Sequence, residues 1–182
     1  DFSNGDALVE KIQKKIKRYE SRIDGHHIMI FYYKIASLYF GDGNYQKCIE
    51  FLKKIIDNKS LEVREDLMCF SRILNLVAHY EAGKDYHLES LVKSTYKFLI
   101  KMNDMHEVQK EMIKFLRNLP EVSPLYIKDE FRKLHSILKV YEDHPYERRA
   151  FLYLDILSWL ESRIEDRPVA EIIAEKAKLV SR

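Results

Sequence analysis

The sequence predicts an all-α protein of about nine helices, stacked as antiparallel pairs. Apolar residues recur at helical spacing along the whole chain, as with Leu8, Ile12 and Ile16 near its start. Helix-breaking residues return at intervals of roughly 20 residues, which suits helices joined by short turns. No segment keeps the alternating apolar and polar pattern of a half-buried β-strand.

The expected helices follow from the positions of these breaks. Gly43 and Gly83 can take the left-handed conformation that ends a helix, and Pro124, Pro145 and Pro168 stand where a first helical turn tolerates a missing N–H group. Short connections make successive helices antiparallel. In order, the helices are expected over residues 6–24, 27–41, 44–58, 62–82, 86–102, 105–119, 124–143, 145–165 and 168–181.

Length and composition indicate one folded domain over residues 1–182. The chain is 46% hydrophobic and 33% charged, with only five Gly and four Pro, which excludes a disordered protein. Its 31 basic and 29 acidic residues give a formal charge of +2, so there is no global field to hold nucleic acid or an anionic membrane. Cys48 and Cys69 are expected to be buried thiols, and Trp159, the single tryptophan, is expected in the core.

The sequence also bears on where the protein resides. Its longest apolar run, Ile28 to Tyr33, is far shorter than the roughly 18 residues needed to span a bilayer, and the start of the chain lacks a signal-like hydrophobic segment. A soluble cytoplasmic protein is therefore expected. Because the chain starts at Asp1 rather than Met, it is expected to be a fragment of a longer protein, and its localisation depends on what precedes it.

The most regular helix pair lies in residues 29–60, where bulky and small residues are placed so that two helices can approach closely. The residues concerned are Tyr32, Ile35, Ala36 and Tyr39 in the first helix, Gly43 in the turn, and Tyr45, Cys48, Leu52 and Ile55 in the second helix. In this order of residues the segment resembles a tetratricopeptide repeat (TPR). Residues 63–102 repeat the order of helix, glycine, aromatic residue and helix in a degenerate form. The resemblance implies a TPR-like right-handed α-solenoid that acts as a non-catalytic binding scaffold.

The resemblance also implies where such a scaffold binds. In TPR proteins the first helix of each pair lines a concave wall, and residues that face away from its own partner helix contact the ligand. The corresponding residues are Ile30, Tyr33, Ser37 and Phe40 in the clearest repeat, and Phe70, Ile73, Val77 and Tyr80 in the degenerate one. They predict an apolar groove for a protein or peptide, such as an amphipathic helix. Alternatively, the groove is filled by another part of the chain or by a second copy, which makes the chain a self-associating (homo-oligomeric) structural domain.

Residue patterns that carry catalysis or bind metals and cofactors are missing from the sequence. The seven histidines are scattered without a His-Glu-x-x-His motif, and Cys48 and Cys69 are too far apart for a Cys-x-x-Cys knuckle. The Gly41–Asn44 turn lacks the Lys-Ser/Thr pair of a phosphate-binding loop. We therefore expect no enzyme activity, no catalytic residue, no metal and no cofactor.

The first helix is the most basic segment of the chain. Its basic residues are Lys11, Lys14, Lys15, Lys17, Arg18 and Arg22. A solvated face on a helix that packs against the next one accounts for this charge. The alternative is a nucleic-acid-binding domain that uses this helix, although no aromatic residues for base stacking are interleaved with the basic ones.

Overall fold

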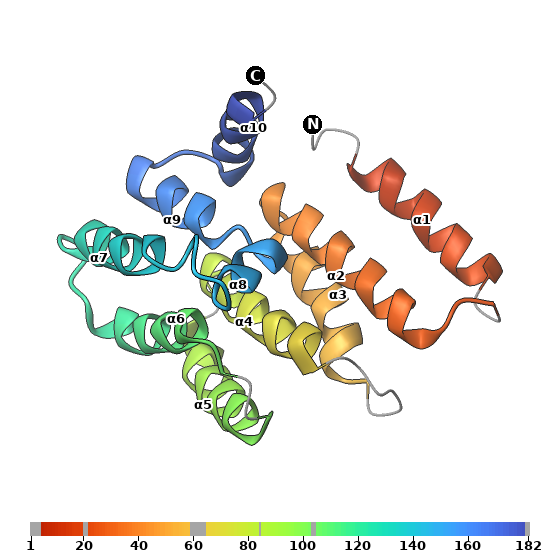
Figure 1. The fold of residues 1–182 in the computed structure, drawn as a ribbon, viewed down its shortest axis with the longest axis horizontal. Helices are drawn as coiled ribbons and strands as arrows, with labels where there is room; N and C mark the ends of the chain where they lie inside the picture. Colours follow the sequence, from red (N-terminus) through yellow and green to blue (C-terminus); the bar gives the residue numbers. More distant parts are fainter. Residues whose placement is uncertain (1–4, 20–21, 59–64, 84, 103–104, 181–182) are drawn as a thin grey trace. The chain divides into compact units, whose positions relative to one another are not determined.

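The computed structural model describes residues 5–19, 22–58, 65–83, 85–102 and 105–180, and every regular element among them is helical (Figure 1). This confirms the predicted all-α class. The chain forms two compact units, Asp1–Ala82 and Gly83–Arg182, each of which is described by itself. The predicted repeat over residues 63–102 spans the boundary between them, because its first helix lies in one unit and its second helix in the other.

The first unit consists of four helices that follow one another closely in the chain. They are α1 (Gly5–Tyr19), α2 (Gly25–Gly41), α3 (Tyr45–Ile56) and α4 (Glu65–Glu81). Asp24 caps the start of α2, where its carboxylate accepts a hydrogen bond from the His27 backbone N–H at 2.9 Å. Because Asp24 has an extended backbone there, the expected helix over residues 6–24 ends earlier, and α1 stops at Tyr19.

The pair α2–α3 is the centre of the first unit. Gly43 turns the chain between the two helices with a φ of +76°, in the left-handed region that favours glycine. Ala36 and Cys48 are fully buried, which allows the helices to approach closely, and Tyr39 stacks on Phe51 with ring centroids 5.8 Å apart. The helix pair predicted in residues 29–60 is therefore present, and α4 packs on its second helix.

The helix α1 lies against α2 through Val9 and Ile16, which are buried. Two hydrogen bonds also hold the first turn of α1 in place. Asp6 accepts them from the Tyr39 hydroxyl and from the Lys47 ammonium, both at 2.8 Å. The hydrogen bond from Lys47 is the main reason that the pKa of Asp6 lies below its usual range. The face of α1 that carries its basic residues is left to solvent.

The second unit contains six α-helices and one short 3-10 helix. They are α5 (Asp85–Met102), α6 (Glu107–Asn118), η1 (Leu119–Glu121), α7 (Ile127–Lys139), α8 (Arg148–Tyr153), α9 (Ile156–Glu165) and α10 (Val169–Val180). Trp159 on α9 is fully buried, as predicted, with its ring edge-on to Phe131 at 5.5 Å and to Phe115 at 6.5 Å. This aromatic cluster joins α6, α7 and α9 into one core.

The helix expected over residues 145–165 is two helices, and the described residues hold ten α-helices, in agreement with the predicted number of about nine. Leu154 is extended, with φ −136° and ψ 122°, and ends α8. Asp155 then caps α9, accepting hydrogen bonds from the Ser158 backbone N–H at 3.0 Å and from its hydroxyl at 2.6 Å. The apolar spacing continues across this break, which is why periodicity alone predicted one helix.

Replacing Asp155 with alanine should lower the free energy of unfolding of the second unit by about 1 kcal/mol, the usual cost of losing such a cap. Urea unfolding followed by Trp159 fluorescence measures it. Asp143→Ala is the matched control, because Asp143 is an exposed aspartate of the preceding turn. Equal stabilities of the two variants would show that the cap does not hold the start of α9.

Candidate functional site

The eight residues predicted to line a TPR-like groove lie within the first unit, on α2 and α4. Tyr33, Phe40, Phe70, Ile73 and Val77 are buried, while Ile30, Ser37 and Tyr80 are half-buried. Every residue of α4 from Ile73 to His79 is buried. The groove on α2 and α4 stays a prediction, and five of its eight residues are buried.

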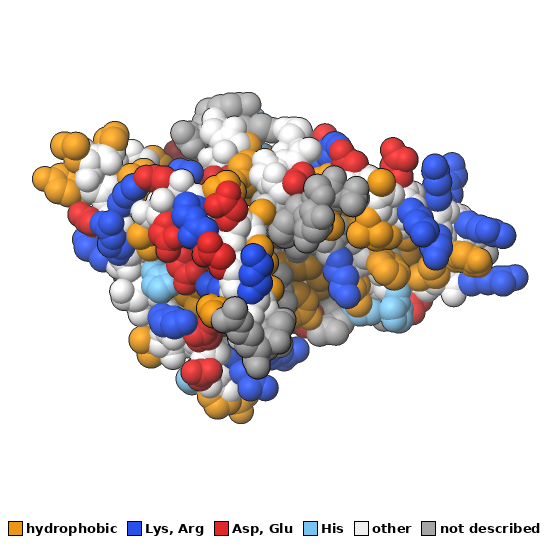
Figure 2. All heavy atoms as spheres, turned by 90° about the horizontal axis from the view of Figure 1, so that it is seen from above, with side chains coloured by type: hydrophobic (Ala, Val, Ile, Leu, Met, Phe, Trp, Pro, Cys, Tyr) orange, Lys and Arg blue, Asp and Glu red, His pale blue; other side chains and the backbone are white. Residues whose placement is uncertain are grey.

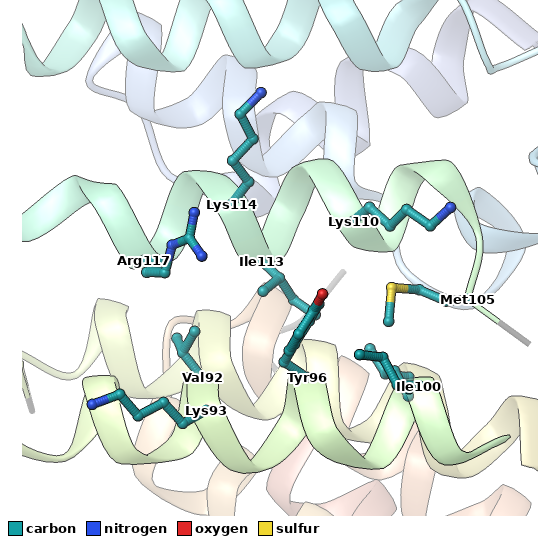
Figure 3. A pocket seen from close by; sticks show the side chains of 10 residues that line it. Val92, Lys93, Tyr96, Ile100, Met105, Lys110, Ile113, Lys114 and Arg117 are labelled. Carbon is teal, nitrogen blue, oxygen red and sulfur yellow. The ribbon is translucent and has the colours of Figure 1, made fainter. Parts of the chain in front are cut away.

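An open groove lies instead in the second unit, between α5 and α6 (Figure 3). Its volume is about 660 Å³. It is lined by Val92, Lys93, Tyr96, Leu99 and Ile100 of α5, by Met105 before α6, and by Lys110, Ile113, Lys114 and Arg117 of α6. These residues recur at spacings of three and four, so one stripe of each helix faces the hollow. We refer to this site as the α5–α6 groove.

The floor of the α5–α6 groove is apolar, and part of it is exposed. Val92, Leu99 and Ile113 are buried between the helices. Tyr96 and Ile100, one helical turn apart on α5, remain 48% and 55% exposed. Two large apolar side chains side by side in a hollow form a patch whose burial by another molecule is favourable, by roughly 25 cal/mol for each Å² of apolar surface removed from water.

Four cations surround this floor, and three of them have acidic partners on their own helix. Lys93 pairs with Glu89, Lys110 with Glu107, and Lys114 with Glu111. The hydrogen bond that Lys110 donates to Glu107 is the main reason that the pKa of Lys110 is raised, so Lys110 stays charged at neutral pH.

Arg117 differs from the three lysines. Among the residues that the structure describes, it has no acidic partner, and its Nε donates only a long hydrogen bond of 3.4 Å to the side-chain oxygen of Asn118. A guanidinium group in this position is available to a carboxylate that enters the groove, and its fork of donors suits such a group.

The arrangement of these side chains gives the groove an apolar centre and charged ends. In Figure 3, Tyr96 and Ile113 point toward one another in the middle. Arg117 lies between the helices at one end, beside Val92, and Lys110 lies at the other end, near Met105. Lys114 points away from α5, so it contributes charge to the rim without filling the hollow.

The lining residues of this site include no His, Cys, Asp or Glu, and its charged groups are three lysines and one arginine. Elsewhere in the described part of the chain, no three such residues gather in a metal-binding group. Cys48 and Cys69 are buried in the first unit, and burial raises the pKa of the Cys48 thiol, which makes that thiol unreactive.

The sequence contained one signal of the α5–α6 groove. Val92, Tyr96, Leu99 and Ile100 give α5 a wide apolar stripe, broad enough to face more than one neighbour. The TPR resemblance predicts the groove on α2 and α4, and residues beyond 108 carry no repeat signature that would indicate a groove beside α6.

Comparison of the chain with protein-family models, with curated proteins and with solved structures found no match. None of the helices in the described ranges combines the length and the apolar character required to cross a lipid bilayer.

Proposed function

We propose that this chain is a non-catalytic protein-binding scaffold whose α5–α6 groove receives an amphipathic helix from a partner protein. The observation that carries the proposal is the exposure of Tyr96 and Ile100 in a hollow bounded by cations. Helix-in-groove recognition uses an apolar face of the ligand, read as anchors three and four residues apart, against such a hollow.

The dimensions of the groove set the length of the ligand. From Val92 to Ile100, the lining stripe of α5 rises by eight residue steps, which at 1.5 Å per step is about 12 Å of helix. A ligand helix of about the same length makes roughly two turns. It therefore presents two or three apolar anchors, enough to cover Tyr96, Ile100 and Ile113.

The charges around the groove determine which charged residues the ligand carries. Arg117 and Lys93 at one end and Lys110 at the other favour acidic residues that flank the apolar anchors at both ends. Exposed ion pairs contribute only about 0.2–1 kcal/mol each, so the apolar anchors supply most of the affinity. The charges raise the association rate and select against basic helices.

Synthetic peptides test this proposal directly. The probe is a fluorescein-labelled helical peptide of about 14 residues, with leucines on one face and glutamates at both ends. One control peptide has the same composition with the leucines scattered around the helix, and another has lysine in place of glutamate. Fluorescence anisotropy should show binding of the acidic amphipathic peptide, with weaker binding of both controls.

Variants of the protein locate the binding site. Tyr96→Ala with Ile100→Ala should weaken binding of the acidic peptide by about tenfold or more, because both side chains lose their contact surface. Tyr126→Ala with Val140→Ala is the matched control, since it removes an exposed tyrosine and an exposed aliphatic residue outside the groove. Wild-type affinity of the Tyr96 and Ile100 double variant, or equal binding of all three peptides, would overturn the proposal.

The second candidate function is self-association, in which the groove receives another copy of the chain. The exposed apolar floor favours this reading as well, because it also becomes buried in a homo-oligomer. Light scattering of the protein alone distinguishes the two. A mass that rises with concentration in the wild type, and is constant in the Tyr96 and Ile100 double variant, would replace the partner helix with a second copy.

A further inference from the structure

The helix α1 has two opposite faces of different character. Val9 and Ile16 are buried against the rest of the first unit. Lys11, Lys14, Lys15 and Arg18 are all exposed, and at about 100° per residue they fall within an arc of roughly 100° on the other side of the helix. The same four residues line one open hollow of about 330 Å³. We refer to these four as the α1 basic face.

The positive charge of the chain is concentrated on this helix. Residues 5–19 contain five basic and two acidic residues, a formal charge of +3, whereas the whole chain carries +2, so all other residues together sum to −1. Figure 2 shows Lys and Arg side chains gathered at its right-hand end, where Figure 1 places α1. A near-neutral composition therefore conceals one strongly basic surface.

The cations of the α1 basic face are also unneutralised. Among the described residues, none of the four forms an ion pair, and Arg18 instead lies over the ring of Tyr19 at 5.6 Å. Exposed basic residues on other helices are commonly paired with an acid three or four residues away, as Lys93 is with Glu89 and Arg132 with Asp129. A helix whose charges served only to keep the protein soluble would have no need to leave its cations unpaired while those of other helices are paired.

The spacing of the charges fits a nucleic-acid backbone. From Lys11 to Arg18 the helix rises by seven residue steps, about 10 Å along its axis, so the mean spacing of the four cations in projection is about 3.5 Å. One strand of a duplex carries one phosphate charge for about every 3.4 Å of its axis. The α1 basic face thus presents nearly the charge density of a single strand, with opposite sign.

The surroundings of this face argue against other anionic partners. A helix that binds a membrane surface buries its apolar side in the lipid, but the apolar side of α1 already packs against α2. A protein interface needs an apolar centre, and the hollow on the α1 basic face is lined, besides the four cations, by Ala7 and Glu10 alone.

We infer that the α1 basic face binds the phosphate backbone of nucleic acid. The four cations offer contacts to phosphate groups, which carry no sequence information directly, so binding does not depend on base sequence. This site lies in the first unit and is independent of the α5–α6 groove. The chain thereby carries two separate binding surfaces, one for a protein helix and one for a polyanion.

A labelled DNA duplex of about 20 base pairs tests the inference. Four phosphate contacts give a slope of about −3.6 in a plot of log K against log salt concentration between 50 and 200 mM. Replacing Lys14, Lys15 and Arg18 together with alanine should weaken binding at low salt by about tenfold or more, and should reduce the slope to about −0.9. Circular dichroism checks that the triple variant keeps its helices.

The matched control is the triple variant Lys97→Ala, Lys101→Ala and Lys178→Ala, which removes three exposed lysines outside α1. It should bind the duplex like the wild type. An equal loss of duplex affinity in both triple variants, or wild-type affinity of the α1 variant, would overturn the assignment of the α1 basic face as the binding site. So would the absence of binding at low salt. Equal binding to polyglutamate or to phosphatidylserine vesicles would show a general polyanion surface instead of a nucleic-acid site.

Discussion

Replacing Phe131 with alanine is expected to destabilise the second unit by about 3–5 kcal/mol, the usual cost of removing a buried aromatic side chain. Phe131 is buried at the centre of the cluster, edge-on to Phe115 at 5.0 Å and to Trp159 at 5.5 Å. Its removal deprives both rings of their neighbour and leaves a cavity where α6, α7 and α9 meet.

Trp159 provides the measurement, because it is the single tryptophan of the chain and lies against the mutated side chain. Urea unfolding followed by its fluorescence should show a lower midpoint for Phe131→Ala. Tyr126→Ala, five residues earlier, is the control, since this aromatic side chain is 63% exposed. Its midpoint should match the wild type. A Phe131→Ala midpoint that also matched the wild type would mean that the aromatic cluster is not the core of this unit.

Replacing Leu52 with alanine is expected to destabilise the first unit by about 2–5 kcal/mol. Leu52 is fully buried on α3, the helix that packs against both α2 and α4. Cys48, one helical turn earlier on α3, is small and fully buried, so it cannot fill the space that a missing leucine leaves. The cavity therefore persists, and the cost falls in the upper part of this range.

The first unit has no tryptophan, so hydrogen exchange is the suitable measurement. Amides of α2 and α3 should exchange faster in Leu52→Ala than in the wild type, whereas those of α9 should be unchanged if the two units unfold separately. The neighbouring Lys53→Ala is the control, because Lys53 is exposed. Unchanged protection of α2 and α3 in Leu52→Ala would contradict the position of this residue in the core.

Most of the fold was predictable from the sequence, and the places where the structure differs from the prediction have local causes. The α2–α3 pair was predicted because Gly43 and the small residues Ala36 and Cys48 all act within one short segment. The break between α8 and α9 was missed, since the apolar spacing runs through it. The hydrogen bonds from Ser158 to Asp155 that stabilise this break compete with helix continuation.

The candidate site was less predictable. The prediction placed an apolar groove on α2 and α4, and the side chains of Phe70, Ile73 and Val77 proved to be buried. The open groove lies between α5 and α6, where Tyr96 and Ile100 have the same helical spacing but stay exposed. Spacing reports that a face is apolar, and it does not report whether another element covers that face.

By itself, the sequence determined the all-helical class, the approximate bounds of most helices, the α2–α3 pair and the basic character of α1. Each of these depends on residues less than about two helix lengths apart, within which periodicity, capping and turn residues act. Only the tertiary structure decided which apolar stripes are core and which remain open, and which cations are neutralised. Those outcomes depend on contacts between side chains that are distant in the chain, such as Phe131 with Trp159, and no local pattern encodes them.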